Sequence, residues 1–251
     1  MRALFVMIYR QLRRFTRAKS RVAGMIINPL VWFIFFGVGW SGVFRDTRMF
    51  GGVDYLTYLA PGIFAMTVFN QSFISGISVI WDREFGFLKE VLVAPASRKE
   101  TIAGRIIGDS VVATLQGFVI LILTIFLAKI RLAGVLPALF IGFLLSIAFS
   151  SFGVSVATRM RSMEGFQMIM AVLMLPLIFL SGAIYPISAM PWWMKFMAYI
   201  NPLTYAVDGA RVFLTGVRGI FPVIHDVILI ALISSALLGV AMLLFERSTI
   251  E

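Results

Sequence analysis

The sequence has no cysteine, a single histidine and few charged residues. Charged side chains make up 14% of the 251 residues, and apolar ones 60%. Soluble domains carry about 25% charged residues, so a soluble, disordered or collagen-like chain is excluded. Without cysteine there is no thiolate nucleophile, iron–sulfur ligand or disulfide. With only His225, neither a two-histidine zinc site nor a Ser–His–Asp triad is complete. We therefore expect no catalytic residue and no metal site.

The sequence also lacks a nucleotide-binding motif. No glycine is followed by lysine, so the P-loop pattern is absent. A G-x-G-x-x-G pattern occurs at residues 37–42, but it lies in an apolar segment and follows no strand. Small residues at such positions let membrane helices approach closely, and Gly104 and Gly108 form a second pair of this kind. We therefore expect no cofactor on this chain.

Long apolar segments dominate the sequence. Crossing a hydrocarbon core takes roughly 20 helical residues, and backbone polar groups in lipid must be satisfied within the segment. The sequence therefore predicts an all-α membrane protein whose residues 22–251 form a single domain of six transmembrane helices. The predicted spans cover residues 22–44, 55–81, 106–128, 132–158, 165–185 and 222–245.

The distribution of basic residues predicts the topology. With the amino terminus inside, 15 of the 22 Lys and Arg residues lie in inner segments and 7 in outer ones. Short cytoplasmic loops of membrane proteins carry such an excess. We therefore expect a multi-pass protein of the cell (plasma) membrane with both termini in the cytoplasm. The net charge of +10 then reflects topology, and no nucleic-acid partner is expected.

Residues 1–21 have the pattern of an amphipathic helix. Leu4, Phe5, Ile8 and Leu12 fall on one side of a helical wheel, and the arginines fall on the opposite side. This pattern predicts a cytoplasmic helix that lies along the membrane surface and forms an elbow before the first span. Membrane lipid is thus an expected partner, with anionic head groups on the arginines.

The inner segment 82–105, between the second and third predicted spans, mixes aromatic residues with charges of both signs. Such a composition suits a protein-docking surface. A loop packed against its own membrane domain is an equally good interpretation. Pro95 should end a short amphipathic helix, and Ser97 with Glu100 matches a capping box at the start of the next helix.

The outer segment 186–221 is apolar, yet prolines divide it into two pieces, 191–201 and 203–215, that are too short to span. We expect a re-entrant helical hairpin here, with tryptophans at the level of the head groups. An interfacial aromatic belt without a wider role is the alternative. Asp208 and Arg211, at i,i+3 spacing, are expected to form a surface ion pair.

Polar residues gather in the middle of the second predicted span. Asn70 and Gln71 lead this group and must face a neighbouring helix or a transport pathway, because polar groups facing lipid are costly. Helix packing accounts for them simply. If the chain contacts a substrate within the membrane, these two residues are the candidates.

The inner segment carries E-F-G from Glu84, with Pro95 and Gly104, and the outer part carries Ser181–Gly182 and N-P-L-T-Y from Asn201. In these residues the chain resembles the type-2 permease subunits of ATP-binding-cassette (ABC) exporters for drugs, lipo-oligosaccharides and polysaccharides. The resemblance implies two permeases, as a homodimer or with a related chain, and two ATPase subunits that hold ATP and magnesium. It also assigns two sets of residues. The ATPase-coupling set is Glu84, Phe85, Gly86, Phe87, Leu88, Lys89 and Glu90. The outer-gate set is Pro186, Pro191, Trp192, Asn201, Pro202, Tyr205 and Arg211.

The expected function is therefore that of a non-catalytic permease subunit that moves an amphipathic drug, lipid or glycan out of the cytoplasm with ATP hydrolysed by a separate subunit. An ion-coupled secondary transporter would need broken helices or acids at the middle of the membrane. A non-transporting membrane assembly partner could share the inner docking segment.

Because the chain has no cysteine, single introduced cysteines report the topology directly. Cysteines at Ser97 and Ser188 should react with an impermeant maleimide from opposite sides of the membrane. Labelling of both positions from the same side would contradict the six-span topology.

Overall fold

The structure is a computed structural model, and it describes residues 2–17, 19–86, 97–160 and 162–247. Every regular element within these ranges is helical. The elements at the amino-terminal side are α1 (Arg2–Arg17), α2 (Lys19–Trp32), the π-helix η1 (Phe33–Val38), α3 (Gly39–Ser41), the short η2 (Thr47–Phe50), α4 (Tyr55–Ile74) and α5 (Ile77–Glu84). They are followed by α7 (Arg98–Ile125), η3 (Leu132–Gly134), α8 (Val135–Arg159), α9 (Met163–Phe179), η4 (Ile187–Ala189), α10 (Trp192–Ile200), α11 (Pro202–Thr215) and α12 (Val223–Glu246).

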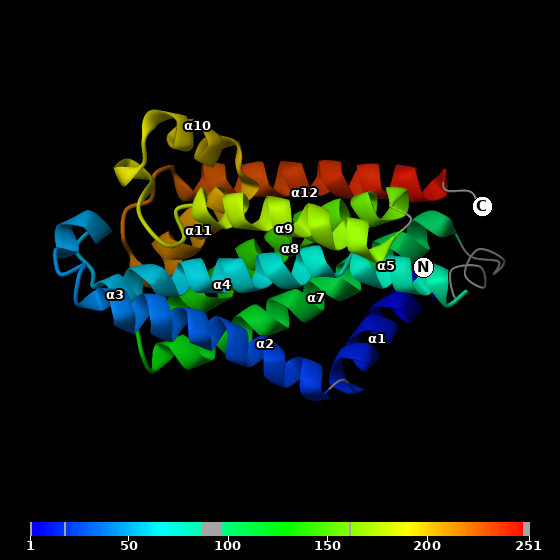
Figure 1. The fold of residues 1–251 in the computed structure, drawn as a ribbon, viewed down its shortest axis with the longest axis horizontal. Helices are drawn as coiled ribbons and strands as arrows, with labels where there is room; N and C mark the ends of the chain where they lie inside the picture. Colours follow the sequence, from blue (N-terminus) through cyan, green and yellow to red (C-terminus); the bar gives the residue numbers. More distant parts are fainter. Residues whose placement is uncertain (1, 18, 87–96, 161, 248–251) are drawn as a thin grey trace.

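The long helices lie side by side in an elongated bundle (Figure 1). Four stretches are long and apolar enough to cross a membrane: Thr47–Glu84, Arg98–Ile125, Leu132–Arg159 and Val223–Glu246. Two shorter apolar helical stretches, Ile27–Ser41 and Met163–Phe179, coincide with the first and fifth predicted spans. The all-helical class is thus confirmed for the described residues, together with four stretches of spanning length. Both ends of the chain lie at the same end of the bundle (Figure 1).

The first predicted span is divided into three helical pieces. Pro29 lies inside α2, where it removes a backbone donor, and the π-helix η1 follows directly. A ladder of stacked rings continues through the irregular part: Trp32 on Phe36 at 5.1 Å between centroids, Phe36 on Trp40 at 6.4 Å, and Trp40 on Phe44 at 5.5 Å. The stacked rings thus continue along one side of the chain through η1, where the backbone hydrogen bonds change from the α to the π pattern.

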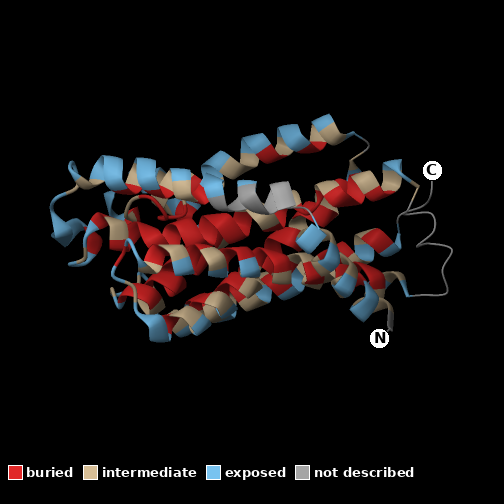
Figure 2. Ribbon diagram, turned by 90° about the horizontal axis from the view of Figure 1, so that it is seen from below, coloured by how far each residue is buried: buried red, intermediate tan, exposed pale blue. Residues whose placement is uncertain are grey.

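Helix α4 forms the centre of the bundle. It packs against α7, α8 and α11, and nearly all of its residues are buried, including Leu59, Phe64 and Phe69 at 0% exposure. In Figure 2 the buried residues run through the middle of the molecule. Most residues of α12 are exposed or only partly buried. The second predicted span breaks between Ile74 and Ile77, so that α5 continues as a separate helix.

Glycines in α4 and α7 allow two close backbone contacts. A Cβ at Gly62 would lie 2.3 Å from the carbonyl oxygen of Ala183, so α4 touches the turn that follows α9. A Cβ at Gly104 would lie 2.5 Å from the carbonyl oxygen of Leu4, and one at Gly108 3.1 Å from Cα of Ile8. The predicted close approach at Gly104 and Gly108 is therefore confirmed, and the partner helix is α1.

Replacing Gly104 by Ala should loosen α1 from α7. The added methyl group meets backbone atoms of Leu4, which cannot rotate away, so we expect a loss of about 1–3 kcal/mol in the free energy of unfolding. Thermal unfolding in detergent measures this loss. Gly239→Ala is the matched control, since a Cβ there meets nothing within 4 Å, and it should be neutral or slightly stabilising. Equal effects of the two substitutions would contradict the α1–α7 contact.

Candidate functional site

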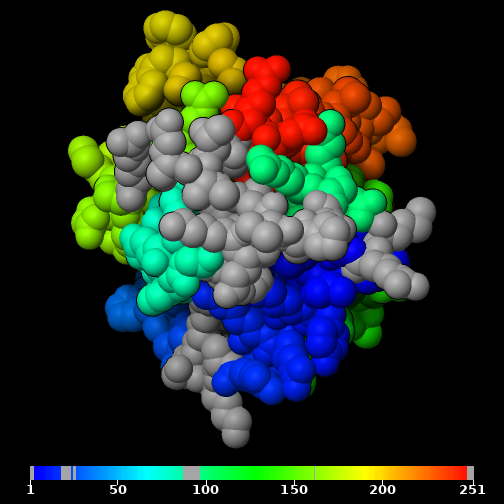
Figure 3. Space-filling view, turned by 90° about the vertical axis from the view of Figure 1, so that its right-hand side faces the viewer, coloured from blue at the N-terminus to red at the C-terminus, as the bar shows by residue number. Residues whose placement is uncertain are grey.

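One end of the bundle gathers the predicted inner segments. Figure 3 faces this end and shows α1, the end of α5, the start of α7 and the end of α12 next to one another. Helix α1 packs along α7, as the two glycine contacts require. Because its apolar residues Leu4 and Ile8 meet α7, its arginine side is left facing outward and toward α5. We call this region the inner end.

The inner end is held by a cluster of charged side chains from three helices. Arg105 of α7 donates through Nη1 to Oδ2 of Asp82 in α5 at 2.7 Å. Arg10 of α1 binds the same carboxylate with two bonds, Nη2 to Oδ1 at 2.9 Å and Nη1 to Oδ2 at 3.2 Å. The second amino group of Arg105 donates to Oγ of Ser78 at 2.6 Å. We call these four residues the Asp82 cluster.

The Asp82 cluster is withdrawn from water. The side chains of Arg105 and Asp82 are 3% and 8% exposed, whereas Arg10 is 27% exposed. Burying an ion pair costs desolvation energy, and only good geometry with further hydrogen bonds offsets that cost. Asp82 receives three hydrogen bonds from two guanidinium groups, which meets this condition. The cluster therefore fixes the relative positions of α1, α5 and α7.

Two further contacts join the remaining helices to the inner end. Arg83 of α5 donates to the carbonyl oxygens of Met160 at 2.8 Å and Thr158 at 3.1 Å, which lie at the carboxyl end of α8. Lys99 of α7 pairs with Glu246 of α12 at 3.0 Å, with both side chains about half exposed. These two contacts thus tie α8 and α12 to the same end of the bundle as the Asp82 cluster.

The predicted coupling segment is partly helical. Residues 82–84 belong to α5 and residues 98–105 to α7, and the hydrogen bond from Arg105 to Asp82 joins the two helices. The predicted cap at Ser97 is confirmed, since its hydroxyl accepts from the amide of Glu100 at 3.5 Å. Glu84 is exposed, Phe85 is 82% exposed, and Gly86 has a φ of +76°, a left-handed value that favours glycine. The other coupling residues, Phe87, Leu88, Lys89 and Glu90, lie outside the described residues.

At the opposite end, which we call the outer end, Arg211 is the centre of a second polar cluster. Its Nη2 donates to the carbonyl oxygen of Gly182 at 2.8 Å, and its guanidinium lies 3.8 Å from the centre of the Tyr58 ring. The hydroxyl of Tyr58 also donates to Gly182, at 3.2 Å. Gly182 itself has a φ of +74°. Arg211 thus joins α11 to α4 and to the turn after α9.

The two predicted short helices of the outer segment are confirmed as α10 and α11. Asn201 lies between them: its Oδ1 accepts from the amide of Leu203 at 3.0 Å, and its Nδ2 donates to Leu177 of α9 at 2.7 Å. Pro202 occupies the first turn of α11, where its missing N–H costs nothing, and Tyr205 donates its hydroxyl to Tyr199 of α10. The remaining residues of the predicted outer gate lie at helix starts or on the surface: Pro186 before η4, Pro191 before α10, and Trp192 at 82% exposure.

The predicted surface pair of Asp208 with Arg211 is wrong. Both residues are buried, at 3% and 5% exposure. Arg211 turns toward Gly182, while Oδ2 of Asp208 accepts from the amides of Ile220 at 2.7 Å and Phe221 at 3.1 Å. Burial raises the pKa of the Asp208 carboxyl, and the hydrogen bond from the Phe221 amide opposes this effect. Spacing along one helix could not reveal partners that lie on other segments.

Asp226 is a buried acid that the sequence analysis did not single out as functional. It lies in the first turn of α12 at 0% exposure, and neither carboxylate oxygen has a hydrogen-bond partner. Its carboxylate faces Gly209 of α11 and is close enough to Asp208 for the two charges to repel each other. The sequence signal available was an acidic residue just inside an apolar run.

Asn70 and Gln71 lie near the end of α4 and are half-buried. The side-chain oxygen of Asn70 is buried without a hydrogen-bond partner. The nearby Ser72 behaves differently, since its hydroxyl donates to Val68 within the same helix at 2.6 Å. Asn70 therefore keeps an unused acceptor inside the bundle.

These features define a class of protein. A bundle of apolar helices with four stretches of spanning length is the architecture of a polytopic membrane protein. Residues 2–215 match the family described as ABC-2 type transporter. The chain belongs to this family, whose members are membrane permeases of ABC transporters.

Three relatives illustrate the family. A chain of Cyanophora paradoxa named transport permease ycf38 is 33% identical over 213 residues, which cover 83% of this chain and 72% of that one. The daunorubicin resistance ABC transporter permease protein DrrB1 of Streptomyces coeruleorubidus is 26% identical over 93% of this chain and 81% of its own length. The multidrug ABC transporter permease YbhR of Escherichia coli is 27% identical over 62% of this chain and 43% of its own length.

Replacing Asp82 by Asn should strongly destabilise the protein. The substitution removes the carboxylate that the buried guanidinium of Arg105 binds, and breaking a buried ion pair typically costs about 3–5 kcal/mol. Thermal or denaturant unfolding in detergent measures this cost. Lys99→Gln is the control, because its exposed pair with Glu246 should contribute at most about 1 kcal/mol. If Asp82→Asn were as mild as the control, the cluster would not hold the inner end.

Proposed function

We propose that this chain is the membrane subunit of an ATP-driven exporter and that its inner end docks on a separate ATPase. Membership of the ABC-2 family supports the permease role. The observation that carries the docking site is Phe85, which is 82% exposed immediately after α5, a helix anchored by the Asp82 cluster. An aromatic residue exposed on a rigid support is typical of the central contact in a protein interface.

The Asp82 cluster supplies a route for force. Asp82 and Arg105 are the first and last residues of the predicted coupling segment. Their side chains are joined by a hydrogen bond of 2.7 Å. A push on this segment therefore reaches α5 and α7 together, and Arg10 passes it on to α1. ATP binding by a pair of ATPase subunits would shift the equilibrium between two permease conformations by favouring one of them. The ATP and magnesium belong to those subunits.

The proposed topology has six spans in the plasma membrane. Both termini and the segment 82–105 lie in the cytoplasm. The four stretches of spanning length provide four of the spans. We assign the first span to α2, η1 and α3, and the fifth to α9 with the turn that follows it. Segment 186–221 then forms the re-entrant outer hairpin, with the exposed Trp192 and Trp193 of α10 at head-group level.

The transport unit in this proposal contains two permeases, either two copies of this chain or this chain with a related one. The substrate class is an amphipathic drug, lipid or glycan. The names of DrrB1 and YbhR, which refer to daunorubicin and to multiple drugs, favour the drug class. Asn70 is the proposed contact within the membrane, because its side-chain oxygen is buried and unsatisfied; Gln71, the next residue, is the second candidate.

An ion-coupled transporter is the second candidate function, and Asp226 is the observation that favours it. A buried carboxylate inside an apolar helix is a feature that such transporters use to carry protons or ions. Asp226 lies at the outer end of α12, however, and not at the middle of the membrane, where coupling sites are found. Proton flux in proteoliposomes without nucleotide would favour this alternative. A non-transporting assembly partner would bind the ATPase but show no export.

Replacing Phe85 and Phe87 by Ala should abolish co-purification of the ATPase. The two substitutions remove the apolar anchors of the proposed interface, so affinity should fall at least tenfold. Pull-down of the partner ATPase measures the loss.

Phe126→Ala is the matched control for this experiment. Phe126 is also 82% exposed, but it caps the opposite end of α7. It should leave ATPase binding unchanged. Retention of the ATPase by the Phe85/Phe87 variant, with normal ATP turnover, would refute the docking assignment.

A further inference from the structure

The second predicted span is interrupted between α4 and α5, and neither the ATPase contact nor the proposed substrate contact accounts for this interruption. In Figure 1, α5 follows α4 toward the end of the bundle where both ends of the chain lie. Amides of a regular α-helix bond to the carbonyl oxygen four positions back. At the interruption, four amides bond three positions back instead: Ser75 to Ser72 at 3.2 Å, Gly76 to Phe73 at 3.3 Å, Ser78 to Ser75 at 3.1 Å and Val79 to Gly76 at 2.9 Å. A tightly wound stretch inside a long helix often marks a functional hinge.

Serine side chains favour this winding. The hydroxyl of Ser75 donates to the carbonyl oxygen of Ser72 at 2.7 Å, and the hydroxyl of Ser78 donates to that of Ser75 at 2.6 Å. Hydroxyl groups that bond back to their own helix compete with the backbone amides and bend the helix. Gly76 adds the low helix propensity of glycine. The interruption is therefore encoded in residues 72–79, which we call the α4–α5 junction.

The α4–α5 junction touches α8 through backbone atoms. A Cβ at Gly76 would lie 2.5 Å from the carbonyl oxygen of Gly153 in α8, and a Cβ at Gly153 would lie 2.6 Å from that of Phe73. The two helices therefore meet here without side chains that interlock. Interlocking side chains resist sliding and rotation in a close-packed interior, and the contact between the two glycines lacks them. This contact allows one helix to turn on the other.

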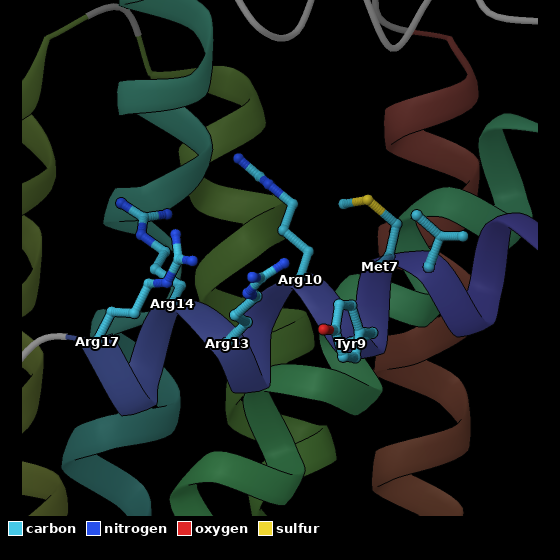
Figure 4. A pocket seen from close by; sticks show the side chains of 7 residues that line it. Met7, Tyr9, Arg10, Arg13, Arg14 and Arg17 are labelled. Carbon is cyan, nitrogen blue, oxygen red and sulfur yellow. The ribbon is translucent and has the colours of Figure 1, made fainter.

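On the inner side of the junction, α5 is bound to three other helices. Asp82 accepts hydrogen bonds from Arg105 of α7 and from Arg10 of α1. Figure 4 shows α1 lying across its neighbours, with the side chain of Arg10 extended from it. Arg83 joins α5 to the carboxyl end of α8 through the carbonyl oxygen of Met160. A movement of the inner end therefore carries α5 with it.

On the outer side of the junction, α4 is bound to the outer end. The hydroxyl of Tyr55 donates to the carbonyl oxygen of Ile184 at 3.1 Å. The hydroxyl of Tyr58 and the guanidinium of Arg211 both donate to the carbonyl oxygen of Gly182. Helices α4 and α5 are thus fixed to different parts of the molecule. A movement of one part relative to the other bends this pair of helices at the junction, where the backbone hydrogen bonding changes.

We propose that the α4–α5 junction is a hinge, with Gly76 and Gly153 as its pivot, through which the inner end turns as a unit relative to the outer end. Hinges of this kind consist of a few residues at the ends of elements, and these residues are often small. The role of the hinge rests on the proposed function, because the ATPase would supply the movement that the hinge directs. Its existence does not, because every contact that forms it lies within this chain. The hinge can therefore be tested on the chain alone, without ATPase or substrate.

Distances between spin labels report the movement. Labelled cysteines replace Glu84 at the end of α5 and Ser188 in η4 at the outer end, where both side chains are exposed. The labelled chain in nanodiscs is diluted with unlabelled chain, so that pulsed electron–electron resonance measures distances within one molecule. Ser75→Ala should narrow the distance distribution by about half, because alanine favours an unbroken helix and lacks the hydroxyl that bonds back to Ser72. Ser75→Gly, which weakens the helix further, should broaden the distribution.

Ser235→Ala is the matched control. The hydroxyl of Ser235 makes the same kind of bond, to the carbonyl oxygen of Ala231 at 2.8 Å, but inside the uninterrupted helix α12. This substitution should leave the distance distribution unchanged. Equal widths for Ser75→Ala and the unsubstituted chain would overturn the proposal, as would an equal narrowing in the control. Loss of the fold cannot imitate the expected result, because an unfolded chain broadens the distribution.

Amide hydrogen exchange in the same nanodiscs locates the movement. The amides of the junction should exchange about tenfold faster than those of residues 62–68 of α4, although both stretches lie inside the bundle, and Ser75→Ala should remove this difference. Equal protection of the two stretches in the wild-type chain would overturn the hinge. A chain that shows the expected exchange but binds no ATPase keeps the hinge and loses the proposed function. A chain that exports with uniform protection of α4 and α5 loses the hinge alone.

Discussion

The carboxylate of Asp82 is the contact on which the inner end depends. It lies at the end of α5 and binds both Arg105 of α7 and Arg10 of α1, so one side chain joins three helices that are far apart in the sequence. A buried ionic group of this kind gives little net stability compared with apolar packing, but breaking it is costly. The arrangement therefore specifies one geometry of the inner end. Such a specified geometry is what a segment needs if it is to transmit a movement to the membrane domain.

The rest of the structure extends this constraint across the molecule. Helix α5 carries Ser78 and Asp82 of the cluster, and α4, which precedes it, crosses the most buried part of the bundle. At the other end of α4, the ring of Tyr58 meets the guanidinium of Arg211. Arg211 in turn binds the turn at Gly182, between α9 and α10. A chain of packed and hydrogen-bonded contacts thus connects the inner cluster with the outer hairpin through one central helix. These contacts identify the elements whose movement would have to be concerted.

Local patterns predicted much of this fold, and tertiary partners account for what they did not predict. The positions of α10 and α11 followed from Pro191 and Pro202, and the start of α7 from Ser97, because each signal acts on its own backbone. The glycines at 104 and 108 indicated a close helix contact but could not show that α1 would occupy it. The pairing of Asp82 with Arg105 and Arg10 crosses 23 and 72 positions, which no helical spacing encodes. Asp208 and Arg211 were assigned to each other by spacing alone, and the fold gave each a different partner.

If Asp82 holds α1, α5 and α7 as one unit, removing its charge must change amide hydrogen exchange in these helices. Exchange is compared between the wild-type chain and its Asp82→Asn variant in the same nanodiscs, at a temperature where both are folded. The account predicts faster exchange in α1 and in the first turns of α7 of the variant, with α11 unchanged. Unchanged protection of α1 would contradict the account, because α1 would then be held by its glycine contacts alone.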